Sequence, residues 1–253
     1  MKRPVCRACS LTLGRFLLLG IFVLPFDFQA HPSDAPSEAV KTKGEKAASG
    51  SAVVESEPLD VVKAKADKGD AAAQYALGGR YDTGNGVPKD SAAAVRWYRR
   101  AADQGNADAQ FLLGSSYAVG VGVTKDDAEA LKWYRKAAEQ GKAEAQAKLG
   151  LIYANGYGAP KDDAEALKWG RKAADQGNAD AQFLLGCLCP IGKGVPKDGV
   201  EAYKWFNLSA AGGDTKAAER RASLAQRMTP DQIAVVQHLI REFRSKREIP
   251  PSL

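Results

Sequence analysis

The chain has few of the residues that catalytic and metal sites require. Its 253 residues include only two histidines, His31 and His238, so we expect no zinc site. The sequence contains neither a Gly-x-Ser-x-Gly elbow nor a Ser-x-x-Lys motif, which argues against the common serine hydrolase and serine β-lactamase chemistries. We therefore predict no metal, no cofactor and no catalytic residue, and a protein that is not an enzyme.

Cysteine is also scarce. Two of the four cysteines, Cys6 and Cys9, stand near the N-terminus, while Cys187 and Cys189 stand close together in the second half of the chain. This pattern is not a disulfide framework. Cys187 could be a reactive thiol, but no histidine is near it in sequence, so a small packed or partly exposed side chain is favoured.

The chain lacks a long hydrophobic run. Residues 16–26 form an apolar stretch of about 11 residues, which is too short for a membrane-spanning helix but typical of a secretory signal peptide. We predict that residues 1–30 are this signal and that cleavage follows Ala30, although Phe28 stands where a small residue is preferred. Export to a bacterial periplasm or to the medium follows. The alternative is an uncleaved leader that anchors the chain to the inner membrane, the one case in which we expect membrane contact.

The excess of positive charge is concentrated at the N-terminus. The formal net charge is +6, but residues 1–30 contain four basic residues and one acid, so the remainder is close to neutral. The basic overall charge therefore no longer argues for a nucleic-acid partner.

Residues 31–56 are rich in Ser, Pro, Gly, Ala, Lys and Glu, and we predict a disordered linker there.

What the sequence does contain is a repeat. Gly69 returns after every 36 residues, and the pairs Ala73-Gln74 and Leu77-Gly78 return with it. A fixed period of this length is typical of stacked helical units. We predict four units, at 69–104, 105–140, 141–176 and 177–212. A leading helix at 57–68 precedes them, and a fifth first helix with C-terminal capping helices follows at 213–248.

Each unit is expected to form two helices joined by a glycine-rich turn. In the first helix, Ala73, Leu77 and Tyr81 fall on one stripe, and the glycine at Gly78 implies that another helix approaches closely. Asp90 and its copies, of which Asp198 is the last, are expected to cap the second helix. One tryptophan recurs in each second helix, and we predict a buried structural role for all four: Trp97, Trp133, Trp169 and Trp205.

This order of motifs closely resembles the Sel-one-like repeat, a relative of the tetratricopeptide repeat. The resemblance covers residues 69–212 and implies an all-α, right-handed α-solenoid of stacked helix-turn-helix units that serves as a protein-interaction scaffold. Two units depart from the pattern. Cys189 replaces a tyrosine and is followed by Pro190, so the first helix of the fourth unit should end early. Gly170 replaces an aromatic residue in the third unit, which should thin the core there.

The resemblance also implies where a partner binds. In tetratricopeptide arrays the concave surface is formed by the first helices, at three positions in each. By this correspondence the partner-binding residues are Tyr75, Asp108, Phe111, Glu144, Leu151, Asp180 and Phe183, within rows that also include Ala72, Ala147, Gly79, Ser115 and Cys187. The rows combine acidic and aromatic side chains, which suits a protein or peptide with apolar anchors and basic flanks. Alternatively, the aromatic residues pack between units and the acids form an ordinary solvated edge.

Together these features predict an exported, non-enzymatic scaffold or adaptor that binds a protein partner. The alternative is a cell-envelope protein that binds or hydrolyses cell-wall peptides, as its cysteine-rich relatives have been claimed to do. The paired repeat cysteines of those relatives are missing from this chain.

Overall fold

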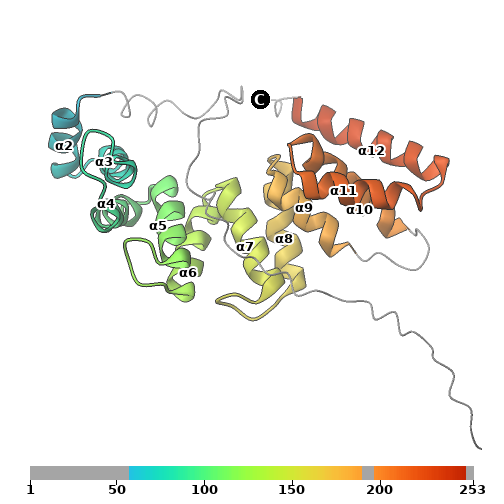
Figure 1. Ribbon diagram of the computed structural model, residues 1–253, viewed down its shortest axis with the longest axis horizontal. Helices are drawn as coiled ribbons and strands as arrows, with labels where there is room; N and C mark the ends of the chain where they lie inside the picture. Colours follow the sequence, from blue (N-terminus) through green and yellow to red (C-terminus); the bar gives the residue numbers. More distant parts are fainter. Residues whose placement is uncertain (1–56, 190–196, 249–253) are drawn as a thin grey trace, which may run out of the picture. The chain divides into compact units, whose positions relative to one another are not determined.

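The computed structural model describes residues 57–189 and 197–248, and these residues form helices joined by turns (Figure 1). The predicted signal peptide and linker, residues 1–56, lie outside the described residues. Consecutive helices pack against one another along the chain, which confirms the prediction of an all-α fold built from stacked helix pairs. The helices are α2 Leu59–Asp67, α3 Ala71–Thr83, α4 Ser91–Asp103, α5 Ala107–Val119, α6 Asp127–Glu139, α7 Ala143–Asn155, α8 Asp163–Asp175, α9 Ala179–Leu188, α10 Lys197–Ala211, α11 Thr215–Ala225 and α12 Pro230–Glu248.

Short polar side chains start most of these helices. The side chains of Asp70, Asn106, Asn178 and Asp214 accept a hydrogen bond from the backbone N–H three residues on, as expected for helix N-caps. Asp90, Asp126 and Asp162 do the same for the second helices. The expectation fails for Asp198, because α10 begins at Lys197 and Asp198 therefore lies inside the helix.

Glycine ends each full-length first helix and shapes the turn after it. α3, α5 and α7 end at glycines with left-handed backbone angles, where other residues would be strained. Gly122, two residues after such a cap, also lies against the start of the preceding unit's second helix. A Cβ atom at this position would lie 2.2 Å from the carbonyl oxygen of Ser91. The turn therefore packs directly onto its neighbour.

The two helices of a unit approach closely where glycine meets an aromatic ring. A Cβ atom on Gly78 would lie 2.6 Å from Tyr98, and one on Gly114 would lie 2.9 Å from Tyr134. The predicted close approach is thus confirmed. In the third unit the ring is missing because residue 170 is glycine. Leu184 of the next unit occupies the space beside Gly150, and a Cβ atom on this glycine would lie 2.9 Å from it.

Three of the four tryptophans are buried as predicted. Trp133, Trp169 and Trp205 are at most 7% exposed, and Trp133 packs against the second helix of the preceding unit. Trp97 is only half-buried, so the prediction is wrong in part. Its cover is the nine-residue helix α2 rather than a full unit, and the guanidinium of Arg100 stacks on its outer face at 4.4 Å.

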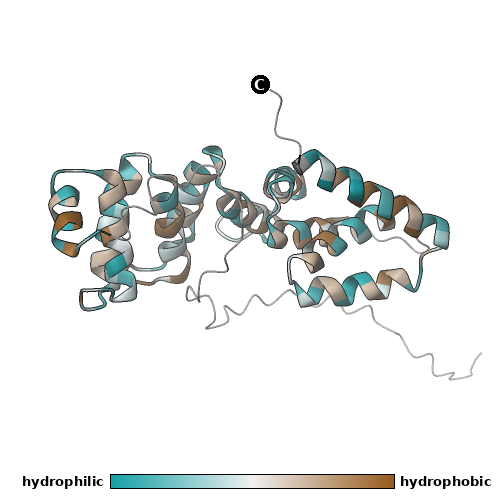
Figure 2. Cartoon of the chain, turned by 90° about the horizontal axis from the view of Figure 1, so that it is seen from above, coloured by the Kyte–Doolittle hydropathy of each residue, from teal (hydrophilic) through white to brown (hydrophobic). Residues whose placement is uncertain are grey.

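The C-terminal end of the array is closed by α12. Its residues Val236 and Ile240 join the core of the last unit, and Phe243 meets Trp205 edge to face at 5.5 Å. Hydrophilic and hydrophobic residues are interleaved along each helix in Figure 2. Within residues 57–189 and 197–248, no helix combines the length and the hydrophobicity that crossing a bilayer requires.

Candidate partner-binding face

The aromatic row of the predicted face lies on the first helices and is supported from behind. Tyr75 on α3, Phe111 on α5 and Phe183 on α9 are half-buried. Each ring packs against the aromatic ring of its own unit's second helix, with centroid separations of 6.1, 5.8 and 5.6 Å. These ring contacts lie within a unit, whereas the apolar clusters that Tyr75 and Phe111 join also contain residues of the following unit. Each outer ring is therefore supported by a second ring of its own unit.

The third unit contributes no ring to this row. Its equivalent residue, Ala147, is buried, and Gly170 stands where the supporting ring would be. Leu151, the predicted contact one turn further along α7, is half-buried. The row therefore presents aromatic rings in units one, two and four and an aliphatic side chain in unit three.

The acidic row is less negative than the sequence predicts. Lys142 reaches across two units, with its ammonium 2.7 Å from Asp108 and 3.4 Å from Glu144. It also lies 5.9 Å from the ring centre of Phe111. Burial alone would lower the pKa of Lys142, but the contacts with Asp108 and Glu144 outweigh it and raise the pKa. Only Asp180, on α9, extends the row as an exposed carboxylate that is not joined to this cluster.

The third row consists of Gly79, Ser115, Leu151 and Cys187. In the first two units it lies next to the hydroxyl groups of the supporting tyrosines. The Tyr134 hydroxyl donates to the Ser115 hydroxyl at 3.1 Å. Burial raises the pKa of Tyr134, which the bond to Ser115 only partly offsets, and burial also raises the pKa of Tyr98. Both phenols are therefore neutral structural groups at physiological pH.

Two of the predicted positions line a shallow pocket. Tyr75 and Gly79 border a space of about 260 Å³ on α3, together with Ala76, Arg80, Thr83 and Asn85. This volume lies just below the usual range for small-molecule sites, about 300–1,000 Å³. The pocket suits one side chain of a partner better than a free ligand.

Chemical groups for catalysis are sparse on this face. Cys187, the fourth member of the third row, is exposed. Desolvation raises the pKa of its thiol, so the reactive thiolate is disfavoured at neutral pH. Across the described parts of the chain, no group of three or more His, Cys, Asp and Glu side chains is arranged to hold a metal ion.

The sequence analysis missed a chain of glutamines that joins the units. Gln74, Gln110, Gln146 and Gln182 are buried, and each donates to a backbone carbonyl eight residues earlier, in the preceding helix. The first three also accept from a second glutamine, at Gln104, Gln140 and Gln176. Their recurrence at 36 residues was visible in the sequence, but the pairing across 30 residues depends on how the helices stack.

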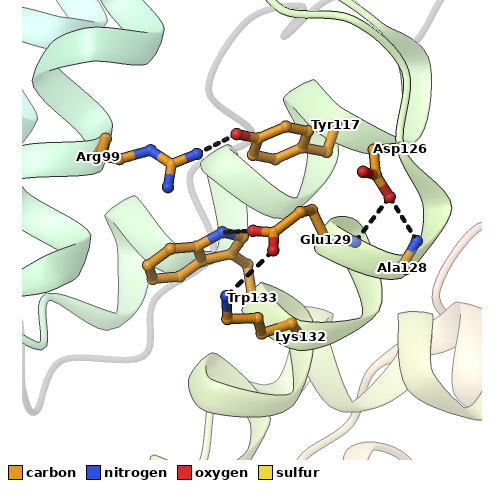
Figure 3. A network of polar contacts seen from close by, with 7 residues as sticks. All are labelled: Arg99, Tyr117, Asp126, Ala128, Glu129, Lys132 and Trp133. Atoms are coloured by element: carbon orange, nitrogen blue, oxygen red, sulfur yellow. Dashed lines mark hydrogen bonds and ion pairs between the residues drawn. The ribbon is translucent and has the colours of Figure 1, made fainter.

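A second contact links the first unit to the second through Arg, Tyr and Trp, and its arginine–tyrosine hydrogen bond recurs between the second and third units. Arg99 on α4 donates to the Tyr117 hydroxyl on α5, and its guanidinium carbon lies 5.4 Å from the ring centres of both Tyr117 and Trp133 (Figure 3). Glu129 accepts from the Trp133 indole at 3.1 Å and from Lys132 at 3.0 Å. These contacts fix the tryptophan between two units.

A protein-family model for the Sel1 repeat matches the chain at residues 71–106, 107–142, 143–178 and 179–214. These units have the predicted period and begin two residues later than the predicted ones. No match is found among curated protein sequences.

Two solved structures extend the comparison. The chain is 42% identical to a Sel1 repeat protein from Oxalobacter formigenes, with a TM-score of 0.58, over 66% of this chain and 64% of that one. It is 38% identical to c5321, a protective antigen present in uropathogenic Escherichia coli strains that displays an SLR fold. That match has a TM-score of 0.64 and covers 73% of this chain but 40% of the other. The chain thus matches less than two thirds of the length of either relative.

Proposed function

Because the chain belongs to the Sel1 repeat family, we propose that it is a non-enzymatic scaffold that binds a protein or peptide partner through the face formed by its first helices. The observation that carries the proposal is the row of half-exposed rings at Tyr75, Phe111 and Phe183, each supported by a second ring. Repeats of this kind generally mediate contacts between proteins.

The energetics of this row favour binding of apolar side chains. A half-buried ring that packs against a second ring loses less conformational entropy on binding than a fully exposed one, so more of the contact energy is available for affinity. The charged residues beside the rings would fix the orientation of the bound partner. Lys142 offsets one of the two negative charges of Asp108 and Glu144, whereas Asp180 can pair with a basic residue of the partner beside Phe183. The proposed partner segment therefore has apolar anchors in register with the units and a basic residue near its contact with the fourth.

Site-specific photocrosslinking tests this proposal without removing any ring. A benzophenone side chain is introduced at Asp180 on the predicted face, and a matched one at Arg96, an exposed residue on the second helix α4. We expect a protein adduct from position 180 and none from position 96. Adducts formed equally at both positions, or at position 96 alone, would refute the proposed face.

We further propose that residues 1–30 direct export to a bacterial periplasm or to the medium, with the inner-membrane anchor as the alternative. Support comes from the basic N-terminus followed by the short apolar run of residues 16–26. Mass measurement of the mature N-terminus separates the two. Cleavage after Ala30 supports export as a released protein, whereas an intact leader in the membrane fraction supports the anchor.

A further inference from the structure

The hydrogen bond between arginine and tyrosine is present at the first two junctions between units and missing at the third. At the first junction Arg99 donates to Tyr117, and at the second Arg135 donates to Tyr153 at 2.5 Å. At the third junction the arginine is present as Arg171, but residue 189, which is equivalent to the two tyrosines, is cysteine. The third junction therefore retains the hydrogen-bond donor and lacks the phenol.

A pocket lies where the missing ring would be. It has a volume of about 420 Å³ and is bordered by Leu167, Arg171, Leu185, Cys189, Glu201 and Trp205, among others. Each of these residues has an equivalent at the first junction, two repeats earlier in the chain. Three of the equivalents, Val95, Leu113 and Trp133, belong to the apolar cluster against which Tyr117 packs. The pocket is thus the environment of a tyrosine side chain without the tyrosine.

Contacts within the chain hold the walls of the pocket. Glu201 and Lys204 form an ion pair at 2.7 Å, and the Lys204 ammonium lies 4.3 Å from the Trp205 ring centre. Trp205 is held from its other side by Phe243 of α12. Arg171 is exposed, as is Arg135, which binds its tyrosine hydroxyl from the surface.

We propose that this pocket binds a tyrosine side chain of the protein partner, which takes the position that Tyr117 and Tyr153 occupy at the other junctions. The inference rests on the proposed scaffold function. The phenol ring packs against Leu167, Leu185 and Trp205, and its hydroxyl accepts a hydrogen bond from the Arg171 guanidinium. A hydrogen bond to a charged group is stronger than a neutral one, so the hydroxyl distinguishes tyrosine from phenylalanine.

The pocket itself is tested with 4-methylphenol, the free side chain of tyrosine, and with toluene, which lacks the hydroxyl. Indole N–H signals in nuclear magnetic resonance spectra report on each tryptophan separately. We expect 4-methylphenol to shift the Trp205 signal and to leave that of Trp133 unchanged, and toluene to bind about ten-fold more weakly. Arg171→Ala should remove this preference. Absence of a Trp205 shift, or equal binding of both compounds, would overturn the inference.

Two variants at Cys189 provide the matched control. Cys189→Tyr restores the ring within the chain. Residue 189 is the extended residue that ends α9, but its φ of −67° is close to the helical value and its N–H still bonds to the Leu185 carbonyl, so its Cβ atom leaves the chain in the direction it would have in a helix. We expect Cys189→Tyr to raise the melting temperature and to abolish 4-methylphenol binding, whereas Cys189→Ser keeps the binding. Unchanged binding in Cys189→Tyr would contradict the assignment of the pocket.

The partner's tyrosine is tested with the adduct formed from position 180. Cys189→Tyr should reduce its yield, and Cys189→Ser should not. An adduct unaffected by Cys189→Tyr would overturn the inference and leave the scaffold proposal intact. If 4-methylphenol binds at Trp205 but position 180 gives no adduct, the scaffold proposal fails. The assignment of the pocket as a binding site for a phenol ring then remains, without a protein partner.

Discussion

Replacing Gln110 by methionine should weaken the junction between the first and second units. Gln110 is 4% exposed, and its side-chain amide donates to the Ala102 carbonyl at 3.1 Å and accepts from Gln140 at 2.7 Å. Methionine has a similar length and is apolar, so Gln110→Met removes both hydrogen bonds and leaves little empty volume.

The expected loss of stability depends on the hydrogen bonds that Ala102 and Gln140, the two partners of Gln110, keep after the substitution. The Ala102 carbonyl still accepts from the Gly105 N–H at 3.0 Å, and the exposed Gln140 amide can bind water, so neither group is left fully unsatisfied. Each lost hydrogen bond then costs about 0.5–1.5 kcal/mol of the free energy of unfolding, or about 1–3 kcal/mol in total. At the fourth unit Gln182 donates to Ala174, but residue 212 is glycine and offers no side-chain donor, so Gln182→Met should cost about half as much.

Urea unfolding followed by circular dichroism gives the required free energies. A double-mutant cycle of Gln110→Met with Gln140→Ala should show a coupling of about 1 kcal/mol, because the second substitution removes a bond that the first has already broken. The reasoning is wrong if the coupling is zero, or if Gln182→Met costs as much as Gln110→Met.

Three further predictions concern the core. Gly114→Ala gains about 1 kcal/mol of helix propensity but brings a Cβ atom to 2.9 Å from Tyr134, so a net loss of about 1–2 kcal/mol is expected in thermal unfolding; a gain would show that the ring can move. Trp133→Ala should cost about 3–5 kcal/mol, whereas Trp97→Ala, at a half-buried position, should cost clearly less; equal values would contradict the burial difference. The raised pKa values of Tyr98 and Tyr134 predict alkaline destabilisation. Above pH ~10 the unfolded phenols lose protons that the folded ones keep, so the free energy of unfolding falls as the pH rises. Tyr98→Phe should make that fall less steep in a pH titration of stability, and an unchanged slope would contradict the raised pKa.

The sequence predicts most of the fold because the 36-residue period imposes the same choices four times. Glycine beside a leucine in the middle of a helix has few explanations other than a close neighbour, and the rings of Tyr98 and Tyr134 are that neighbour. The early end of α9 at Leu188 followed from Pro190, since a residue before proline disfavours the helical conformation.

The candidate face is less visible in the sequence. The lysine that compensates the acidic row, Lys142, stands where the other units have a capping Asn or Asp, so its contact with Asp108 depends on the distance between α5 and α7. The exposure of Trp97 likewise depends on how much of its ring α2 can cover. The sequence does carry a signal for the pocket beside Cys189. Arg171 retains the position of Arg99 while its partner residue changes to cysteine.

The junction between the third and fourth units has consequences for how the chain comes apart. In stacked repeats stability is a sum of unit terms and nearest-neighbour terms, so strain or heat acts first on the weakest interface. This interface lacks the tyrosine at 189, whereas Arg99 and Arg135 each bind a tyrosine hydroxyl at the other two junctions. We expect the array to separate there into two blocks of unequal length, each melting as its own cooperative body, and a partner that fills the tyrosine position would fuse the two transitions into one.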